Sequence, residues 1–531
     1  MSTQQEIYTG IWVNWSYGKV HGSTITLSPE GSAYFIAFIA LFVRLVGSHL
    51  WTNIAFTTSL IRSSRPRDGL YHQQQAILRN SSSPASVTWD TLKLAWFWNG
   101  SAPGAKSRTL TFAFFSLSYI IAFTAAGIFS SKISSTNSEV LLVSGQNCGL
   151  WDDETLGPAP DYSSSAYQAW QFQGIRLETN INQAFRSAHS YVSQCHDSNG
   201  TVNVGDASCL PLGRETIAWT SQVADCPFDT HLCIADAIQF DSGFINSHTH
   251  LGINAGSEDR IEYRRVTTCA PITTEGHVSN WVNATEAGFT IDDGGWMDGE
   301  TLLKYAYGQN YLFSNNTTFA YSNYTWGFLV GYWSEPNIYK LDIEISLADP
   351  NNPNSLAGAT FTALPTLSRE DADTVLVFLS INGTSLVRID DPWLKYTTEV
   401  EAFKVNSNGT TTPTMTMYRR NAPVNVVACA EQHQLRNPRT GATSRLGGME
   451  VNTYPVADSL GFNQNQLLTY NRSFVVGSKA GLTSVLYNLG GSALLANANQ
   501  YGLTTTNLSS KQWQIEFDHF FGVSLNSLQL W

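Results

Sequence analysis

The chain lacks the sequence signatures of well-known catalytic sites. It contains no Gly-x-Ser-x-Gly elbow, no Walker loop, no Gly-x-Gly-x-x-Gly turn and no His-Glu-x-x-His helix. Charged residues are scarce, at 14% of the chain, against about a quarter in an average soluble domain. Cysteine is absent until Cys148, and all seven cysteines lie from there onward. The sequence therefore identifies no catalytic residue and predicts no cofactor.

The few charges are divided unevenly along the chain. Residues 1–130 carry nine Lys and Arg against four Asp and Glu, whereas residues 131–531 carry 21 against 38. An acidic surface repels the phosphates of a nucleic acid, so we expect no nucleic-acid partner. The abundance of Asn, Ser, Thr and Gly in place of charge favours a glycosylated, loop-rich exterior over a cytosolic enzyme.

Two long apolar runs are present near the N-terminus. Residues 109–131 contain no charged side chain and are long enough, as a helix, to cross the hydrocarbon of a bilayer. Residues 33–56 form the other run. Arg44 near its middle costs about 2.5–3.5 kcal/mol on insertion scales, which the surrounding Phe, Ile, Leu and Val offset. We interpret Arg44 as snorkelling from a tilted helix, with an intramembrane or headgroup contact as the alternative. Both runs predict transmembrane helices, and the lipid bilayer is the first expected partner.

The loop between the two runs is basic. Residues 57–108 hold seven Lys and Arg and two Asp, whereas one Lys precedes the first run and one follows soon after the second. The positive-inside rule places this loop in the cytosol, and a short segment at 1–32 and the remainder at 132–531 outside it. An aromatic segment of the loop indicates either a helix in the membrane interface or a short helix packed on protein. Its apolar residues are Trp89, Leu92, Leu94, Trp96, Phe97 and Trp98.

The spacing of apolar residues predicts an α+β ectodomain, mixed in secondary structure and disulfide-bonded. Residues 132–312 are predicted to be cysteine-rich, helical and loop-rich, with a helix near 166–192. Residues 313–456 are predicted to be β-rich. Residues 457–531 are predicted to be helical, with an apolar face near the end. Whether the helix at 509–531 meets the membrane stays open.

Individual strands can be expected within the β-rich part. Apolar runs between turn residues predict strands at 319–333, 338–347, 374–381 and 412–429. Ser368 with Asp371 resembles an N-cap and predicts one helical turn before the third of these strands.

The cysteines all follow the second apolar run, as expected for an oxidising compartment. Short loops close at the least entropic cost, which favours bridges between Cys195 and Cys209 and between Cys226 and Cys233. Cys269 and Cys429 are further disulfide candidates. Their pairing stays open, as does the identity of the cysteine that an odd number leaves unpaired.

Asn-x-Ser/Thr sequons are spread over the predicted ectodomain. The candidate glycosylation sites are Asn14, Asn199, Asn283, Asn315, Asn316, Asn323, Asn382, Asn408, Asn471 and Asn507. Chance alone gives about six in the ectodomain, so the excess is mild support. Asn80 and Asn99 also match, but they lie in the basic loop, where no glycan is expected.

His248 and His250 form a short metal-like pattern. On a strand, two His two residues apart share a face and could bind zinc. No third ligand follows by spacing, so polar loop residues are the favoured interpretation and no metal site is predicted. The acidic pairs at 152–153, 292–293 and 390–391 could serve acid/base chemistry. Adjacent carboxylates point to opposite faces of a strand, and in turns they are usually solvated, which favours a structural role.

Four stretches together resemble a known family. They are Ile11–Ser16, Gln75–Ser82, Leu251–Asn254 and Tyr263–Ile272. With them, most of the chain resembles an uncharacterised family of large membrane-anchored glycoproteins of filamentous fungi. The resemblance implies a membrane-anchored glycoprotein and supplies no activity or catalytic residue.

Two classes of function are consistent with these features. The first is an integral membrane glycoprotein, an interaction or structural surface component of the endoplasmic reticulum, secretory pathway or plasma membrane, with a luminal or extracellular ectodomain. The second is a membrane-bound enzyme or accessory factor that acts on an apolar small molecule, for example in fungal secondary metabolism. Its motive is the 16 Trp, 22 Tyr and 27 Phe, which could line a pocket. Because aromatic residues more often serve packing, the sequence favours the first.

Overall fold

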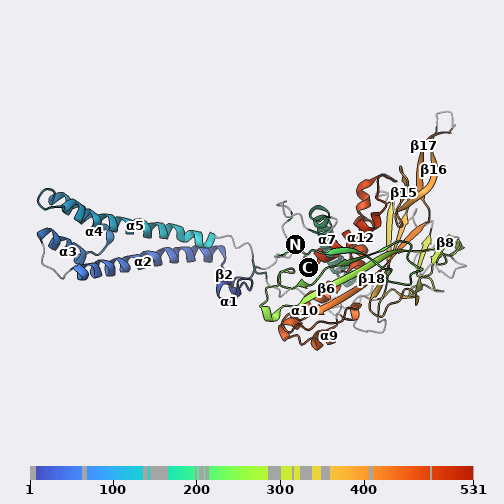
Figure 1. Cartoon of the computed structure of the whole chain (residues 1–531), viewed down its shortest axis with the longest axis horizontal. Helices are drawn as coiled ribbons and strands as arrows, with labels where there is room; N and C mark the ends of the chain where they lie inside the picture. Colours follow the sequence, from blue (N-terminus) through green and yellow to red (C-terminus); the bar gives the residue numbers. More distant parts are fainter. Residues whose placement is uncertain are drawn as a thin grey trace. The chain divides into compact units, whose positions relative to one another are not determined.

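The computed structural model of the chain has a mixed α/β fold, as the sequence predicts, and divides into two compact units, Met1–Gln146 and Asn147–Trp531 (Figure 1). It describes residues 7–62, 68–135, 141–143, 165–197, 200–201, 209, 215–284, 301–313, 316–322, 338–348, 359–405, 411–451, 453–478 and 481–529.

The N-terminal unit is built on two long helices, α2 (Pro29–Arg62) and α5 (Ala105–Ser135). Both extend several residues beyond the apolar runs predicted at 33–56 and 109–131, because flanking residues such as Arg62, Ala105 and Lys106 have high helix propensity. Both are long and apolar enough to cross a membrane. Only 6% of an apolar 18-residue stretch of α2 is buried, and only 11% of the corresponding stretch of α5. A core helix of similar composition would be mostly buried.

The two long helices pack closely at Gly47. The hydroxyl of Tyr119 donates a 2.7 Å hydrogen bond to the Gly47 carbonyl, and a Cβ at this position would lie 2.6 Å from the Phe123 ring. One turn along α2, the rings of Trp51 and Tyr119 lie 5.0 Å apart. A small residue at the crossing thus lets the two backbones approach, as in membrane helix pairs.

Two shorter helices, α3 (Gly69–Asn80) and α4 (Pro84–Phe97), connect the long ones and fold back along them. The Asp68 carboxylate caps α3 by accepting from the Tyr71 amide at 3.1 Å, and it also pairs with Arg108 at 2.7 Å. A small hairpin lies before α2 in the chain. It consists of β1 (Gly10–Val13), α1 (Gly18–His21) and β2 (Ser23–Thr26).

The larger unit is organised around a seven-stranded antiparallel sheet in the order β11-β13-β18-β6-β4-β3, with β5 beside β6. Its strands are β3 (Thr220–Ala224), β4 (Ala237–Asp241), β5 (Ile245–Asn246), β6 (Glu262–Ile272), β11 (Tyr339–Ser346), β13 (Asp373–Ile381) and β18 (Val424–Arg436). Every residue of β13 is buried. Side chains on alternate positions of a strand face opposite ways, so this sheet is covered on both faces and β13 reads as a continuous apolar run.

Helices cover one face of the main sheet. Val375, Val377 and Leu379 point into a core shared with α7 (Ser165–Cys195) and α12 (Gln512–Ser527). The remaining helices of the unit are α9 (Tyr454–Ser459), α10 (Gln464–Ser478) and α11 (Leu482–Leu489), with short 3-10 turns at η2 (Ser257–Asp259), η4 (Met449–Val451), η5 (Gly490–Ala493) and η6 (Leu495–Asn499).

Smaller sheets complete the unit. Leu376 and Phe378 of β13 point away from the helices, into a second core with Tyr305, Phe319 and Phe361. The additional strands are β7 (Val282–Asn283), β8 (Thr301–Tyr305), β9 (Gly308–Asn310), β10 (Phe319–Ser322), β12 (Phe361–Ala363), β14 (Thr384–Ser385), β15 (Ile389–Asp390), β16 (Lys395–Val405), β17 (Thr411–Arg420), β19 (Gln500–Tyr501) and β20 (Thr504–Thr505). The β16–β17 hairpin projects from the rest of the unit (Figure 1).

α12 differs from the sequence expectation in its surroundings. The helix predicted near the C-terminus is present, but polar as well as apolar positions are buried, and only Gln514 and Ile515 escape burial. It lies inside the larger unit, between α7 and the sheet, so it does not present an apolar face to a membrane.

The structure also departs from the expected division at 312. Strands β3, β4 and β6 precede this boundary, and β6 pairs with β18 from Ile272 opposite Val426 to Glu262 opposite Arg436. The part predicted as helical and loop-rich therefore shares one sheet with the β-rich part. Its β6 strand is inconspicuous in the sequence because Arg264, Arg265 and two threonines interrupt the apolar alternation.

Two local predictions are wrong. The strand expected at 412–429 is two strands, β17 and β18, because Asn421 and Pro423 form a turn between them. Ser368 and Asp371 cap no helical turn. The Asp371 carboxylate instead accepts hydrogen bonds of 2.9 and 2.7 Å from the guanidinium of Arg369.

The described residues contain three disulfides. The predicted bridges Cys195–Cys209 and Cys226–Cys233 are both formed, and Cys269 pairs with Cys429 across β6 and β18. The last two cysteines are directly opposite in the sheet register and fully buried. Cys148 lies outside the described residues.

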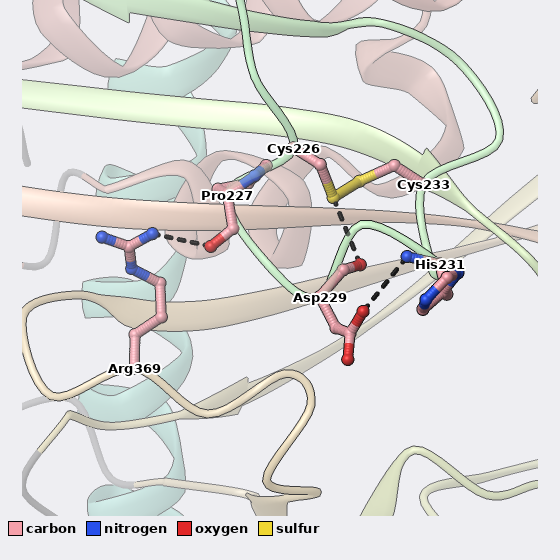
Figure 2. The surroundings of a disulfide bond; sticks show 6 residues. All are labelled: Cys226, Pro227, Asp229, His231, Cys233 and Arg369. Carbon is pink, nitrogen blue, oxygen red and sulfur yellow. Dashed lines mark hydrogen bonds between the residues drawn. A yellow bond between two sulfur atoms is a disulfide. The ribbon is translucent and has the colours of Figure 1, made fainter.

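The Cys226–Cys233 bridge closes a short, tightly bonded loop (Figure 2). The Asp229 carboxylate accepts from the His231 amide at 3.2 Å, and the Sγ of Cys226 lies 3.5 Å from the Asp229 carbonyl oxygen. Arg369 donates a 2.6 Å hydrogen bond to the Pro227 carbonyl, which ties this loop to the segment before β13.

Candidate functional site

A cavity of about 320 Å³ lies where α7, β3, β4 and α12 meet. Its walls combine apolar side chains with a small polar group made of His196, Asp197, Trp219, Asp518 and His519. A volume of this size accommodates a small organic molecule. It is the candidate functional site of the larger unit.

Trp219 forms one wall of the cavity and is held on several sides. A Cβ at Gly522 would lie 2.4 Å from the indole, and one at Gly200 would lie 2.6 Å from it, so only glycine leaves room at either position. The His196 ring stacks on the indole with centroids 4.9 Å apart. The indole Nε1 donates a 3.0 Å hydrogen bond to Oδ1 of Asp518.

The Cys195–Cys209 bridge positions His196. Cys195 is the last residue of α7, and the His196 amide continues the helical bonding by donating to the Val192 carbonyl at 3.1 Å. Burial lowers the pKa of His196, against smaller raising effects of the Ile217 backbone and the Asp197 charge. The ring is therefore uncharged at neutral pH.

His189 of α7 and His519 of α12 form a pair behind the cavity wall. Nε2 of His519 and Nδ1 of His189 are 2.8 Å apart, and the rings meet edge to face. Burial lowers the pKa of His519 to about 3, with a further lowering by His189 and His196. Burial also lowers the pKa of His189. Both rings are neutral at pH 7, so one N–H donates to the unprotonated nitrogen of the other.

Asp518 is the acid of the site. Burial raises its pKa to about 6, partly offset by the hydrogen bond from Trp219. The cavity thus combines a carboxyl group that changes charge near pH 6 with uncharged imidazoles, an indole and apolar walls. Such a set can bind a molecule with an apolar body and one hydrogen-bonding or cationic group, and can exchange a proton with it.

A metal ion has no ligand set in the part of the chain that the structure describes, because no three His, Cys, Asp or Glu side chains there converge as ligands. His248 and His250, the metal-like pattern of the sequence, lie in a turn where each ring contacts a different backbone group. The Nδ1 of His248 is 2.9 Å from the Ile253 carbonyl, and the Nδ1 of His250 accepts from the Asn246 amide at 2.9 Å. His250 also approaches Glu215 at 3.5 Å.

The acidic pair at 390–391 is split between solvent and core. Asp390 is exposed and lies 3.3 Å from the Lys395 amine. Asp391 is buried and accepts amide hydrogen bonds from Trp393 at 2.9 Å and Trp513 at 3.0 Å. Burial raises the pKa of Asp391 to about 6. This carboxylate fixes the start of α12. The pairs at 152–153 and 292–293 lie outside the described residues.

A second buried polar group lies on β6 and β18. Arg265 is fully buried, with its Nε 3.3 Å from Oε1 of Glu431 and its Nη1 donating to the Ser524 hydroxyl at 3.0 Å. The Tyr263 hydroxyl lies 2.7 Å from Nδ1 of His433. The Nε of Arg265 also donates to the Tyr263 hydroxyl at 3.1 Å, so Arg265 connects these groups and links α12 to the sheet.

The structure describes six of the sequon asparagines. Asn316, Asn382, Asn471 and Asn507 are exposed, Asn283 is half-buried in β7, and Asn14 is only 8% exposed. The Asn14 side chain accepts from the Ser16 amide, which holds it against the hairpin. The remaining sequons of the predicted ectodomain lie outside the described residues and are Asn199, Asn315, Asn323 and Asn408.

Sequence spacing could not have identified the cavity residues, because Trp219 and Asp518 are 299 positions apart. One signal was available in α12. Glu516, Asp518 and His519 stand among aromatic residues in a segment that the apolar spacing makes a core helix, and polar groups buried in a core usually have a partner or a role.

Comparison of the chain with protein-family models, curated proteins and solved structures finds no match. The function of the chain must therefore be argued from its own geometry.

Proposed function

We propose that this chain is an integral membrane glycoprotein, anchored by α2 and α5, whose larger unit works outside the cytosol as an interaction or structural surface component. The observation that carries the proposal is the exposure of the two long helices, whose apolar 18-residue stretches are only 6% and 11% buried. Apolar surface of that extent is costly in water and stable in hydrocarbon.

The charges around α2 and α5 support the orientation. The connecting segment carries seven Lys and Arg and two Asp, and the unit that follows is acidic. Positive residues are retained on the cytosolic side, so both ends of the α2–α5 hairpin face the other side.

The chemistry of the larger unit supports the same compartment. Its three disulfides persist in an oxidising lumen or outside the cell, whereas thiols are kept reduced in the cytosol. Four described sequon asparagines are exposed and thus accessible to a glycosyltransferase.

Protease protection tests the proposal. In sealed microsomes that hold the full chain, added protease should cut between α2 and α5 and leave the larger unit intact. The chain should resist extraction at alkaline pH, and glycosidase should lower the mass of the protected fragment. A larger unit that is digested without detergent, or a chain that alkali extracts, contradicts the proposal.

The cavity supports a second candidate, a membrane-bound enzyme or accessory factor that acts on an apolar small molecule. Asp518, with its raised pKa, and the neutral His519 beside an apolar wall are the groups such chemistry requires. A comparison of extractable metabolites between a deletion strain and its parent tests it. Re-expression of the wild-type chain should restore any lost compound, and the Asp518→Asn variant should not. Identical metabolite profiles in both strains count against an enzyme.

A further inference from the structure

α4 has two unlike faces. The inner face packs against α3 and α5 and is buried. It consists of Val87, Thr91, Leu94 and Ala95, none more than 8% exposed. The outer face is aromatic and open, and we call it the α4 face. It consists of Trp89 (62% exposed), Leu92 (42%), Trp96 (82%) and Phe97 (77%). Positions three, four, seven and eight apart share one side of a helix, so these four side chains form a single stripe.

We propose that the α4 face lies in the cytosolic interface of the bilayer that α2 and α5 cross. The proposal rests on the membrane anchoring proposed above and adds a third lipid contact, made by a helix that runs alongside α5 and does not itself cross the membrane. Trp and Phe are favoured at the level of the headgroups, where an aromatic ring meets both hydrocarbon and water.

The depth of α4 follows from its contacts with α5. The Thr88 hydroxyl is 2.7 Å from the Ser116 hydroxyl, and Leu94 shares a buried cluster with Ala105. α4 therefore runs beside residues 105–116, from the charged end of α5 into its apolar run. Trp96 is nearest the charged end, and Trp89 lies about 10 Å deeper, seven residues at 1.5 Å each.

The neighbouring surface of α5 identifies the occupant as lipid. Leu110 and Phe114, in the same stretch of α5, are 43% and 73% exposed. If α5 crosses a bilayer, these side chains contact acyl chains, and the α4 face continues their apolar surface at the same level. A protein partner on the α4 face would have to displace that lipid.

Charge completes the match to an interface. The Lys93 amine lies 5.3 Å from the centre of the Trp89 ring and 3.6 Å from the Asp90 carboxylate, and its side chain is 52% exposed. Lys106, at the charged end of α5, is also exposed. Cations beside an aromatic stripe suit the phosphates of lipid headgroups. On α3, by contrast, the outward residues His72 and Gln73 are polar and suit water.

Photo-crosslinking of the full chain in its membrane tests the proposal. A benzophenone amino acid replaces Trp96 in one variant and His72 in a matched control, since both side chains are exposed on neighbouring helices. The Trp96 variant should form lipid adducts several-fold more often than the His72 variant. Adducts to another protein or to a second copy of the chain at position 96, or equal lipid adducts at both positions, overturn it.

Tryptophan quenching gives a second reading on the same chain. Vesicles made with brominated phosphatidylcholine should quench the wild-type protein more than the Trp89→Phe/Trp96→Phe variant, while Trp51→Phe, a buried control, should leave the quenched fraction unchanged. Failure of the inference differs from failure of the anchoring. A chain that resists alkaline extraction but shows neither quenching nor adducts refutes only the α4 contact, whereas a chain that alkali extracts refutes the anchoring and the α4 contact with it.

Discussion

The indole of Trp219 donates a 3.0 Å hydrogen bond to the carboxylate of Asp518, which joins two residues 299 positions apart at the edge of the cavity. The bond fixes the carboxyl group of α12 against the segment that leads into β3. Trp219 also contacts Gly200, Gly522 and His196. Small substitutions beside it should therefore change the free energy of unfolding before they affect any activity.

Gly522→Ala should destabilise the larger unit. The added Cβ would lie 2.4 Å from the Trp219 ring, which is held too firmly to move freely. Overpacking of this kind costs about 1–3 kcal/mol of unfolding free energy. Urea unfolding followed by tryptophan fluorescence measures it. Gly174→Ala, in the open part of α7, is the matched control and should be neutral or stabilising by up to about 1 kcal/mol. Equal effects at both positions would mean that the contact with Trp219 is not tight.

His519→Gln should reduce the loss of stability in acid. The folded protein holds the pKa of His519 at about 3, below its usual 6.5. Between these pH values the imidazole is protonated in the unfolded chain but not in the folded protein. The unfolding free energy is therefore unaffected by His519 above pH 6.5 and decreases as the pH falls from 6.5 toward 3. Unfolding free energies measured from pH 7 to pH 4 should fall less steeply in the variant. A parallel fall in both proteins would show that His519 does not contribute.

Asp518→Asn should act with the opposite sign. Burial raises the pKa of Asp518 from 3.8 to about 6, so its ionisation destabilises the fold as pH rises through 6. The Asn side chain keeps an acceptor for Trp219 and carries no charge. The variant should gain about 1–3 kcal/mol over the wild type at pH 8 and little at pH 4. A constant difference across this range would assign the effect to packing instead.

Thiol labelling should separate the cysteines by burial. Alkylation of the native chain without reductant should label at most one cysteine and none of the six bridged ones. Mild reductant should open Cys226–Cys233, which is half-buried, before Cys269–Cys429, which is fully buried in the sheet. Peptide mass spectrometry reads both results. Free labelling of several bridged cysteines in the protein from its native membrane would place the larger unit in a reducing compartment.

Glycan mapping should follow exposure as well as sequence. We expect glycans among Asn316, Asn382, Asn471 and Asn507, which are exposed, and none on Asn14, whose side chain is bonded within the hairpin. Mass spectrometry of glycopeptides after isotope-tagged deglycosylation identifies the occupied sites. Asn80 and Asn99 are the controls, since both are exposed but lie in the basic loop. Occupancy of either control would reverse the orientation of α2 and α5.

Local interactions explain which predictions were accurate. The helices α2 and α5 were expected from apolar runs long enough to span a membrane. The helices α7 and α12 and the strands β11 and β13 were expected from residue spacing, because apolar periodicity reflects burial within one element. The bridges Cys195–Cys209 and Cys226–Cys233 were expected because short loops close easily. The boundaries of α2 and α5 were set too narrow, since a helix continues past the end of its apolar run.

Distant pairings explain the misses. β6 was not recognised as a central strand because it contains Arg265, and a charged residue usually indicates an exposed position. Arg265 can be buried because Glu431 of β18 and Ser524 of α12 bond to it. The turn before β18 was overlooked because Met415 and Met417 of β17 and the apolar residues of β18 together resemble one run. The cavity combines α7 with α12, and no spacing rule connects residues so far apart.

The sequence by itself determined that two apolar helices enclose a basic segment, that all cysteines lie on one side of them, and that an α+β unit follows. These properties depend on composition and on periods of a few residues. Only the tertiary structure decided that Cys269 meets Cys429, that α12 is a core helix, and that His196, Asp518 and His519 border one cavity. The physical reason is that burial is a property of the packed chain and not of any local segment. Burial shifts the pKa values of the titratable side chains and determines which groups each side chain contacts.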